Sequence, residues 1–219
     1  MGEAYNAFKL GNIDILTTEN INIEDNIGTI GYNKKEFYGR EHDFIALNTY
    51  DNFLSRWEVR KAISYAIDKS SIVTSVYGGK YYTADNPLDY GNWTFEQGSS
   101  STGYNPDQAK QVLIDGGWSY KYGSWQKVEN YKTIRLSINL TVNADNSSQV
   151  AVADIIKTSL ENIGIKVNVS KLNSASFQTA LNNKNYGMII TGTNSSLSPS
   201  LVTYLSLIHI SEPTRHAQI

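Results

Sequence analysis

The stretch TIRLSINLTV, residues 133–142, decides the fold of this chain. Every second residue from Ile134 to Val142 is apolar, and the residues between them are polar. Side chains of a strand point alternately to its two faces, so this pattern predicts a strand that is buried on one face. After it the period changes. Apolar residues recur at helical spacing from Val152 to Ile163, and Gly164 closes the expected helix.

Alternation returns at residues 166–170, and residues 186–191 are expected to form another strand. Between them, Phe177 and its apolar neighbours predict a short helix after Ser174. The resulting order is strand, helix, strand, helix, strand. That order predicts an α/β sheet with crossover helices.

Upstream of this region, residues 44–48 read as a largely buried strand, and a helix follows them. Ser55 and Glu58 have the spacing of a capping box. In such a box the Ser55 hydroxyl accepts from the backbone N–H of Glu58, and the Glu58 side chain reaches back to the backbone N–H of Ser55. Lys69 is expected in the last turn, where a cation suits the helix dipole. The core-facing stripe of this helix is Val59, Ala62, Ile63, Ala66 and Ile67.

Another helix is expected after Asn105, which suits an N-cap, with Pro106 at its first position. Gly116 and Gly117 end it, and Trp118 folds back over its last turn. The preceding segment, residues 78–103, reads as a long loop that carries several aromatic side chains. Long aromatic loops are more often functional than idle, and Tyr and Trp combine an apolar face with one polar atom.

Composition excludes several classes of function. The chain has 219 residues, of which 40% are hydrophobic and 18% charged, so a packed core is expected. A net charge of −2 gives no electrostatic reason to expect nucleic acid or an anionic membrane as a partner. There is no Cys, and of the three His only His42 lies before residue 205, so no catalytic triad, His-rich metal site or cofactor is expected. Asp51 with Glu58 is a weak candidate for an acid–base pair.

The end of the chain looks foreign to the rest. Residues 205–215, LSLIHISEPTR, resemble the translation of a sequencing adapter and show no helical or strand period. We therefore expect residues 205–219 to be a non-native tail and the natural sequence to be a fragment open at both ends. No export signal is visible at the start, and its absence is uninformative in a fragment.

Two stretches, FIALNT (44–49) and VRKAISYAIDK (59–69), follow one another in this chain. Together they resemble the core signature of solute-binding family 5, the binding proteins of peptide, dipeptide and nickel ABC importers. Further similar stretches follow in order, and these are VYGG (76–79), NPL (86–88), YNPDQAK (104–110), GGW (116–118), and the helix and strand around residues 155–165 and 186.

The resemblance implies a fold like that of type II periplasmic-binding proteins, with two hinged lobes and a mixed α/β sheet in each. Residues 1–43 would be a remnant of the first lobe, and 44–204 an incomplete second lobe. The implied function is an extracytoplasmic, lipid-anchored receptor that captures oligopeptides or dipeptides and delivers them to permease and ATPase subunits. A non-enzymatic monomer is expected, with no cofactor and no nucleic-acid partner.

The candidate ligand-binding residues lie near the hinge, in the aromatic loop and around the last strand: Asn48, Tyr50, Tyr90, Trp93, Phe177, Thr193 and Asn194. Peptide-binding relatives often carry a Trp and an Asp after that last strand. Here residues 192–199 read GTNSSLSP, without either, so the contact to a peptide's amino terminus is not carried over. A non-transport module that binds carbohydrate or a signal peptide remains the alternative.

Overall fold

The computed structural model describes residues 2–18, 23–37, 39, 41–84 and 103–194. The chain divides into two units, residues 1–39 and 40–219. The first unit holds α1 (Gly2–Lys9) and α2 (Glu24–Ile27). Within it the Tyr5 hydroxyl lies 3.2 Å from that of Thr18, and the rings of Phe8 and Tyr32 meet edge to face.

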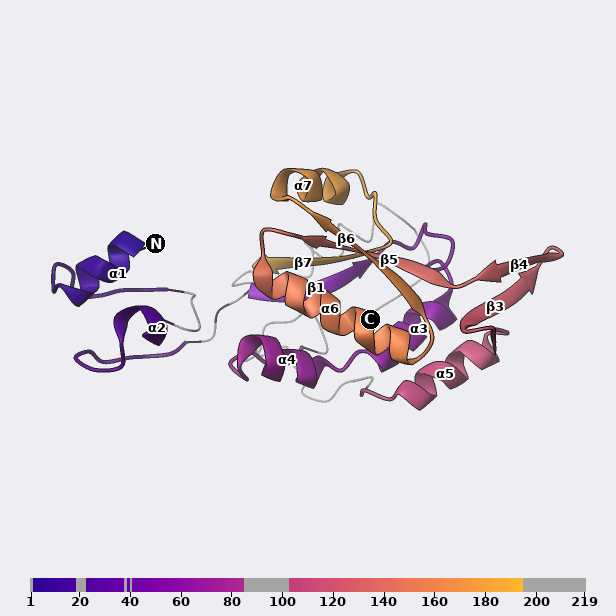
Figure 1. Ribbon diagram of the computed structural model, residues 1–219, viewed down its shortest axis with the longest axis horizontal. Helices are drawn as coiled ribbons and strands as arrows, with labels where there is room; N and C mark the ends of the chain where they lie inside the picture. Colours follow the sequence, from indigo (N-terminus) through magenta and orange to yellow (C-terminus); the bar gives the residue numbers. More distant parts are fainter. Residues whose placement is uncertain (1, 19–22, 38, 40, 85–102, 195–219) are drawn as a thin grey trace, which may run out of the picture. The chain divides into compact units, whose positions relative to one another are not determined.

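The second unit is built on a four-stranded sheet in the order β1-β7-β5-β6 (Figure 1). The strands are β1 (Glu41–Leu47), β5 (Ser137–Asn143), β6 (Lys166–Leu172) and β7 (Met188–Asn194). β5 pairs in parallel with β6 and β7, whereas β1 pairs antiparallel with β7. The sheet is therefore mixed, and its central strands are connected by helical crossovers, as the sequence predicts.

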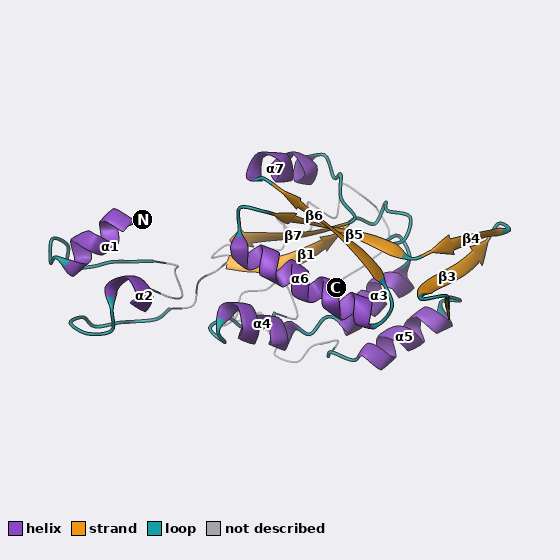
Figure 2. Cartoon of the chain, in the orientation of Figure 1, coloured by secondary structure: helices purple, strands orange, loops and turns teal. Residues whose placement is uncertain are grey.

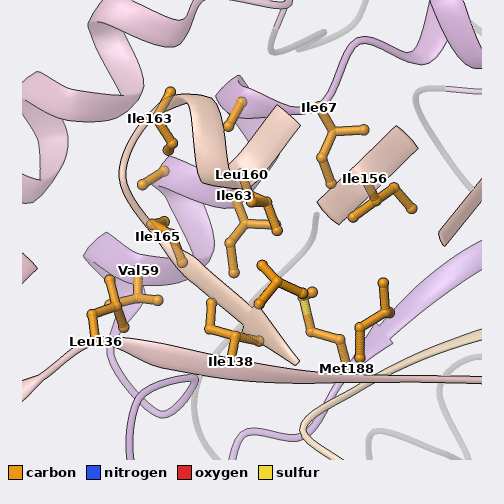
Figure 3. Close-up of a cluster of buried hydrophobic side chains, with 14 of the residues drawn as sticks. Val59, Ile63, Ile67, Leu136, Ile138, Ile156, Leu160, Ile163, Ile165 and Met188 are labelled. Atoms are coloured by element: carbon orange, nitrogen blue, oxygen red, sulfur yellow. The ribbon is translucent and has the colours of Figure 1, made fainter. Parts of the chain in front are cut away.

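Helices cover the two faces of this sheet unequally (Figure 2). α3 (Trp57–Ala66), α4 (Lys69–Tyr77), α5 (Pro106–Asp115) and α6 (Ser147–Asn162) belong to one layer, and α7 (Ser174–Asn182) crosses the opposite face. The predicted stripe of α3 is buried in the first layer. Side chains of α3, α6 and the sheet meet there in one apolar core, drawn in Figure 3.

A second, three-stranded sheet has the order β2-β3-β4 and is antiparallel throughout. Its strands are β2 (Ser119–Lys121), β3 (Ser124–Glu129) and β4 (Lys132–Arg135). The alternating run 133–142 is therefore not one strand, as predicted, but two. The chain leaves the small sheet at Leu136, whose N–H donates to the Trp125 carbonyl, and enters the large sheet as β5.

The expected strand at 44–48 exists, but its side chains are only half-buried, because β1 lies at the edge of the sheet. The helix expected to run on to Lys69 is interrupted. Ile67 is extended, and Asp68 caps a separate helix, α4, by accepting from the Ser71 N–H at 3.0 Å. Lys69 thus begins a helix instead of ending one. By contrast, Asn105 caps α5 as predicted, accepting from the Gln108 N–H.

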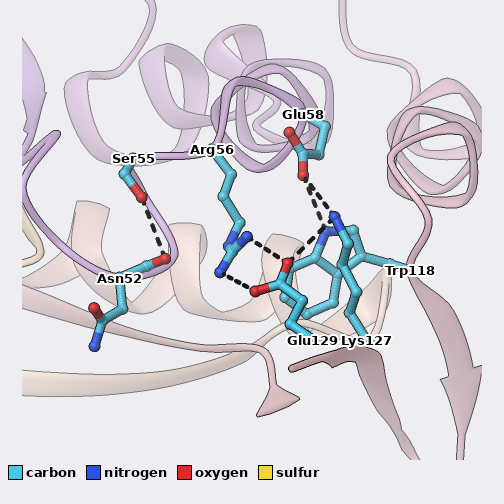
Figure 4. A network of polar contacts seen from close by, with 7 residues as sticks. All are labelled: Asn52, Ser55, Arg56, Glu58, Trp118, Lys127 and Glu129. Carbon is cyan, nitrogen blue, oxygen red and sulfur yellow. Dashed lines mark hydrogen bonds and ion pairs between the residues drawn. The ribbon is translucent and has the colours of Figure 1, made fainter. Parts of the chain in front are cut away.

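The predicted capping box is wrong. Ser55 donates to the Asn52 carbonyl instead of accepting from Glu58. Glu58 is buried and faces Trp118 and Lys127, as Figure 4 shows. The turn before α3 is organised instead by Asp51, whose Oδ1 accepts from the backbone N–H groups of residues 53 and 54.

In the part of the chain that the structure describes, no helix combines the length and the apolar character required to cross a bilayer.

Candidate ligand-binding site

The carboxyl ends of three parallel strands meet at one edge of the large sheet. β5 ends at Asn143, β6 at Leu172 and β7 at Asn194. Because β1 runs antiparallel to β7, its first residue, Glu41, lies opposite Asn194 at the same edge. Ligands of open α/β sheets bind outside the carboxyl ends of the strands. We call this region the carboxyl edge.

One half of the carboxyl edge is a closed polar cluster at the ends of β5 and β6. The carboxylate of Asp145 accepts from both the hydroxyl and the N–H of Ser174, at 2.6 and 2.8 Å. These two hydrogen bonds lower the pKa of Asp145. Asn143 Nδ2 donates to the same hydroxyl at 3.2 Å. The cluster fixes the loop after β5 to the start of α7 and leaves Asp145 exposed, whereas the Asn143 amide oxygen accepts from the Asp145 N–H at 3.1 Å.

The other half of the edge is formed by β1, β7 and the end of α4. Tyr77, the last residue of α4, donates its hydroxyl to Asp43 Oδ2 at 3.3 Å. Its ring packs on that of Tyr81, with 4.3 Å between the centroids. Asp43 lies across from Gly192, and a Cβ on Gly192 would come within 2.5 Å of Asp43 Oδ1. The carboxylate therefore occupies the space that a side chain at position 192 would need.

Desolvation shifts the titration of two neighbouring groups at this half of the edge. It raises the pKa of Asp43, against a smaller opposing effect of the hydrogen bond from Tyr77. Desolvation also lowers the pKa of His42, although the charge of Asp43 opposes that shift. Groups with perturbed pKa values at a sheet edge are candidates for ligand contact.

An open groove of about 460 Å³ lies between α7 and the sheet face that α7 crosses. Hydroxyl and amide side chains dominate its wall, and none of the lining residues is charged. They are Thr141, Ser170, Leu172, Ala175, Ser176, Thr179, Ala180, Asn183 and Asn185.

The structure separates two pairs of predicted site residues. Asn48 and Tyr50 follow the end of β1, whereas Thr193 lies across from His42, near its start. Thr193 lies five positions after Met188 in β7, which corresponds to about 17 Å along a strand. The Asn48 side-chain amide donates to the carbonyls of Lys184 and Tyr186 at 3.2 and 2.9 Å. It therefore fixes the backbone just before β7. These residues do not form one cluster.

The remaining predicted residues have different surroundings. Phe177 is buried within α7. Thr193 and Asn194 belong to the carboxyl end of β7 and hence to the carboxyl edge. Tyr90 and Trp93 lie outside the described residues. The binding roles of all seven stay predictions.

Sequence reasoning missed Asn143, Asp145, Ser174 and Asp43 as candidates. The first three lie within a few residues of the ends of predicted strands, which is the signal that could have identified them. Asp43 could not have been found this way, because it lies at the start of a strand whose antiparallel pairing the sequence does not reveal. Among the described residues, no group of three His, Cys, Asp or Glu is placed to hold a metal ion.

The sequence matches the family described as "Bacterial extracellular solute-binding proteins, family 5 Middle" over residues 2–212. This match includes residues 205–212 of the expected tail, so the boundary at 205 stays a prediction. Among curated relatives, heme-binding protein A of Haemophilus influenzae is 29% identical over 127 residues, which are 57% of this chain and 21% of that protein. The nickel-binding periplasmic protein of Escherichia coli is 26% identical over 153 residues, 68% of this chain and 28% of that protein. The matched segment thus spans well under half of either relative.

Solved structures show the same fold. The oligopeptide-binding protein AppA of Bacillus subtilis, in complex with a nonapeptide, superposes with a TM-score of 0.73 at 21% identity, covering 91% of this chain and 40% of that one. NikA of Brucella suis, in complex with Fe(III)-EDTA, superposes with a TM-score of 0.68 at 25% identity, covering 87% of this chain and 39% of NikA. The predicted fold class, that of type II periplasmic-binding proteins, is confirmed. The chain belongs to the bacterial extracellular solute-binding proteins of family 5.

Proposed function

We propose that this chain is part of the extracytoplasmic receptor of an ABC importer and that it contacts a peptide ligand at the carboxyl edge. The observation that carries the proposal is the coincidence of family membership with a polar edge built from Asn143, Asp145, Ser174 and Asp43. Exposed oxygens at such an edge suit the N–H groups of a peptide backbone. A binding role, without catalysis, is proposed accordingly.

Asp43 is our candidate for the contact with a positively charged ligand group. Residues 192–199 lack an acid, yet the Asp43 carboxylate lies directly against Gly192, where that segment begins. A ligand ammonium close to this carboxylate would favour its charged form and offset the desolvation that raises its pKa. We propose oligopeptides or dipeptides with a free amino terminus as ligands.

In the whole protein, residues up to about 43 would belong to the first lobe and the following residues to the second. Closure of two lobes on the ligand would then deliver it to permease and ATPase subunits. The division of the chain near residue 40 supports this assignment. Lipid anchoring and a monomeric state are proposed with it.

Calorimetry on this chain and on the product of the complete gene tests the proposal. The panel contains a dipeptide, a nonapeptide, the N-acetylated nonapeptide, Ni(II)-histidine, heme and mannohexaose. We expect the complete protein to bind the free peptides, and this chain to bind them much more weakly. Binding of a metal chelate, heme or the glycan without binding of any peptide would overturn the proposal.

The variant Asp43→Asn sharpens the test. We expect it to weaken binding of the free nonapeptide about tenfold or more, by loss of one charge-assisted contact, and to leave the acetylated peptide unaffected. Asp154→Asn is the matched control, because Asp154 is an exposed acid on α6 that pairs with Lys171. An equal loss for both peptides would mean that Asp43 is not the contact for the amino terminus.

A further inference from the structure

The three-stranded sheet has an outward face whose outer residues, on β2 and β4, are exposed, although Gln126 at its centre is buried. In β3, Trp125, Lys127 and Glu129 point inward, toward α3 and the end of α6. The alternate residues point outward, and cross-strand pairing adds their partners from β2 and β4. This outward face consists of Ser119, Lys121, Ser124, Gln126, Val128, Thr133 and Arg135.

The charges on the outward face have one sign. Between Asp115 and Asp145 the only acidic residue is Glu129, which points inward and pairs with Arg56. Neither Lys121 nor Arg135 has an acidic partner among the described residues. The Gln126 amide donates to the Lys121 carbonyl and the Ser124 hydroxyl, so it is satisfied within the face. The chain as a whole has a net charge of −2, so this positive face is a local feature.

Two tyrosines stand at the turns of the same sheet. Tyr122 follows β2 and is 94% exposed, and Tyr131 precedes β4 and is fully exposed. Neither ring makes a hydrogen bond or a ring contact with another described residue. Both residues have a positive φ, +52° and +60°, a conformation that suits Gly or Asn and strains a bulky side chain. Tyrosine thus occupies two positions where it contributes nothing to the described packing and where the backbone disfavours it.

The two rings flank a wide face. Tyr122 and Tyr131 lie at opposite ends of β3, whose six residues extend about 20 Å. Val128, 70% exposed, lies between them. Tyrosine is enriched where protein meets the headgroup region of a bilayer, and Lys and Arg are attracted to anionic headgroups. A surface that carries two cations, Lys121 and Arg135, with aromatic groups at its ends fits a lipid surface better than the single deep anchor typical of a protein hot spot.

We propose that the outward face of the three-stranded sheet rests on an anionic lipid bilayer. This contact is independent of ligand capture at the carboxyl edge, which uses a different sheet. It is peripheral: the two tyrosines enter the headgroup region, while Lys121 and Arg135 neutralise headgroup charge.

Co-sedimentation of the full chain with vesicles tests the proposal. We expect binding to POPC/POPG (3:1) vesicles, little binding to pure POPC, and weakening in 0.5 M salt. The variant K121Q/R135Q should lower the partition coefficient roughly tenfold. The variant K157Q/K171Q is the control, because it changes net charge equally on α6 and β6, where both lysines already pair with acids.

The tyrosines are tested by Y122G/Y131G. Glycine relieves the positive φ, so the melting temperature should stay equal or rise while vesicle binding falls several-fold. A lower melting temperature with unchanged vesicle binding would make the tyrosines structural and overturn the proposal. Equal binding of the wild type to both vesicle types would also overturn the proposal, and so would an equal loss of vesicle binding in the control variant K157Q/K171Q. Absence of vesicle binding, with residues 119–135 protected from hydrogen exchange by detergent-solubilised permease, would assign the face to a protein partner instead.

Discussion

The four-stranded and three-stranded sheets follow one another in the chain, yet different interactions hold them. The large sheet lies beneath a continuous apolar layer, and Leu140 and Val142 of β5 are fully buried in it. The small sheet packs on this layer through Trp125, whose indole N–H donates to the Ile163 carbonyl at 2.8 Å, and through Ile134, which is only partly buried. It also has an ionic attachment. The large sheet is thus stabilised mainly by apolar burial, whereas the small sheet is positioned largely by specific polar contacts.

The ionic attachment joins β3 to the start of α3 (Figure 4). Arg56 binds both carboxylate oxygens of Glu129, at 2.7 and 2.9 Å. Lys127 lies between Glu129 and Glu58, at 3.4 and 3.7 Å, and above the Trp118 ring. Such a network fixes orientation more than it adds stability, since desolvating charges offsets much of their attraction. We therefore expect the two sheets to respond differently to substitution.

The largest effect is expected from Leu140→Ala in the large sheet. Leu140 has no exposed surface, and a cavity there should lower the free energy of unfolding by about 2–5 kcal/mol. Val128→Ala in the small sheet removes methyl groups from a side chain that is 70% exposed, and should change it by less than about 0.5 kcal/mol. Urea denaturation measures both. Similar values would mean that the two sheets are not stabilised differently.

Gly164→Ala tests a contact between the two regions. Gly164 follows α6 with φ +89°, and a Cβ there would collide with the ring of Tyr120 in β2. We expect a cost of about 1–3 kcal/mol in the free energy of unfolding, from backbone strain and the collision together. In the background of Tyr120→Ala only the backbone part should remain, about 1 kcal/mol. Equal costs in both backgrounds, measured by urea denaturation, would show that Tyr120 does not press on this turn.

The pH dependence of stability tests the ionic attachment. The hydrogen bond from Arg56 lowers the pKa of Glu129 below its ordinary value of 4.5. A carboxylate with a lowered pKa stabilises the folded state above the unfolded pKa, and this contribution is lost as the pH falls through the folded pKa. Thermal melts of the wild type should therefore lose stability below about pH 4.5 more steeply than those of Glu129→Gln. Parallel curves would remove Glu129 from the attachment.

The sequence predicts the large sheet better than the small one for a physical reason. Helical and strand periods follow from burial against one broad core, so the stripe of α3 is buried as expected, and β6 and β7 lie within a few residues of their expected positions. In the run 133–142 the period of two continues unbroken across Leu136, although the strand partners change there. The alternation of apolar and polar residues shows which face of a strand is buried. It does not show to which sheet the strand belongs.

The candidate site was predicted less well, because its residues are brought together by topology. Thr193 and Asn194 could be placed at the carboxyl edge from the strand pattern. Asn48 could not, because only the antiparallel register of β1 reveals that it lies at the other end of β7. Its amide group is an attractive ligand contact in sequence, whereas in the fold it satisfies the backbone carbonyls before β7.

The smallest effect is expected from Ser55→Ala. This variant tests whether Glu58 belongs to a capping box or to the contact between α3 and the small sheet. A capping box would make Ser55 worth about 1 kcal/mol and would hold Glu58 at the start of α3. In the structure Glu58 instead faces Lys127 and Trp118, the contact that links α3 to the small sheet. Ser55→Ala should therefore change the free energy of unfolding by less than about 0.5 kcal/mol, whereas Asp51→Ala should cost about 1 kcal/mol, because Asp51 caps this turn. If urea denaturation reversed these two values, Glu58 would belong to the cap, and its contact with Lys127 would not help to attach the small sheet.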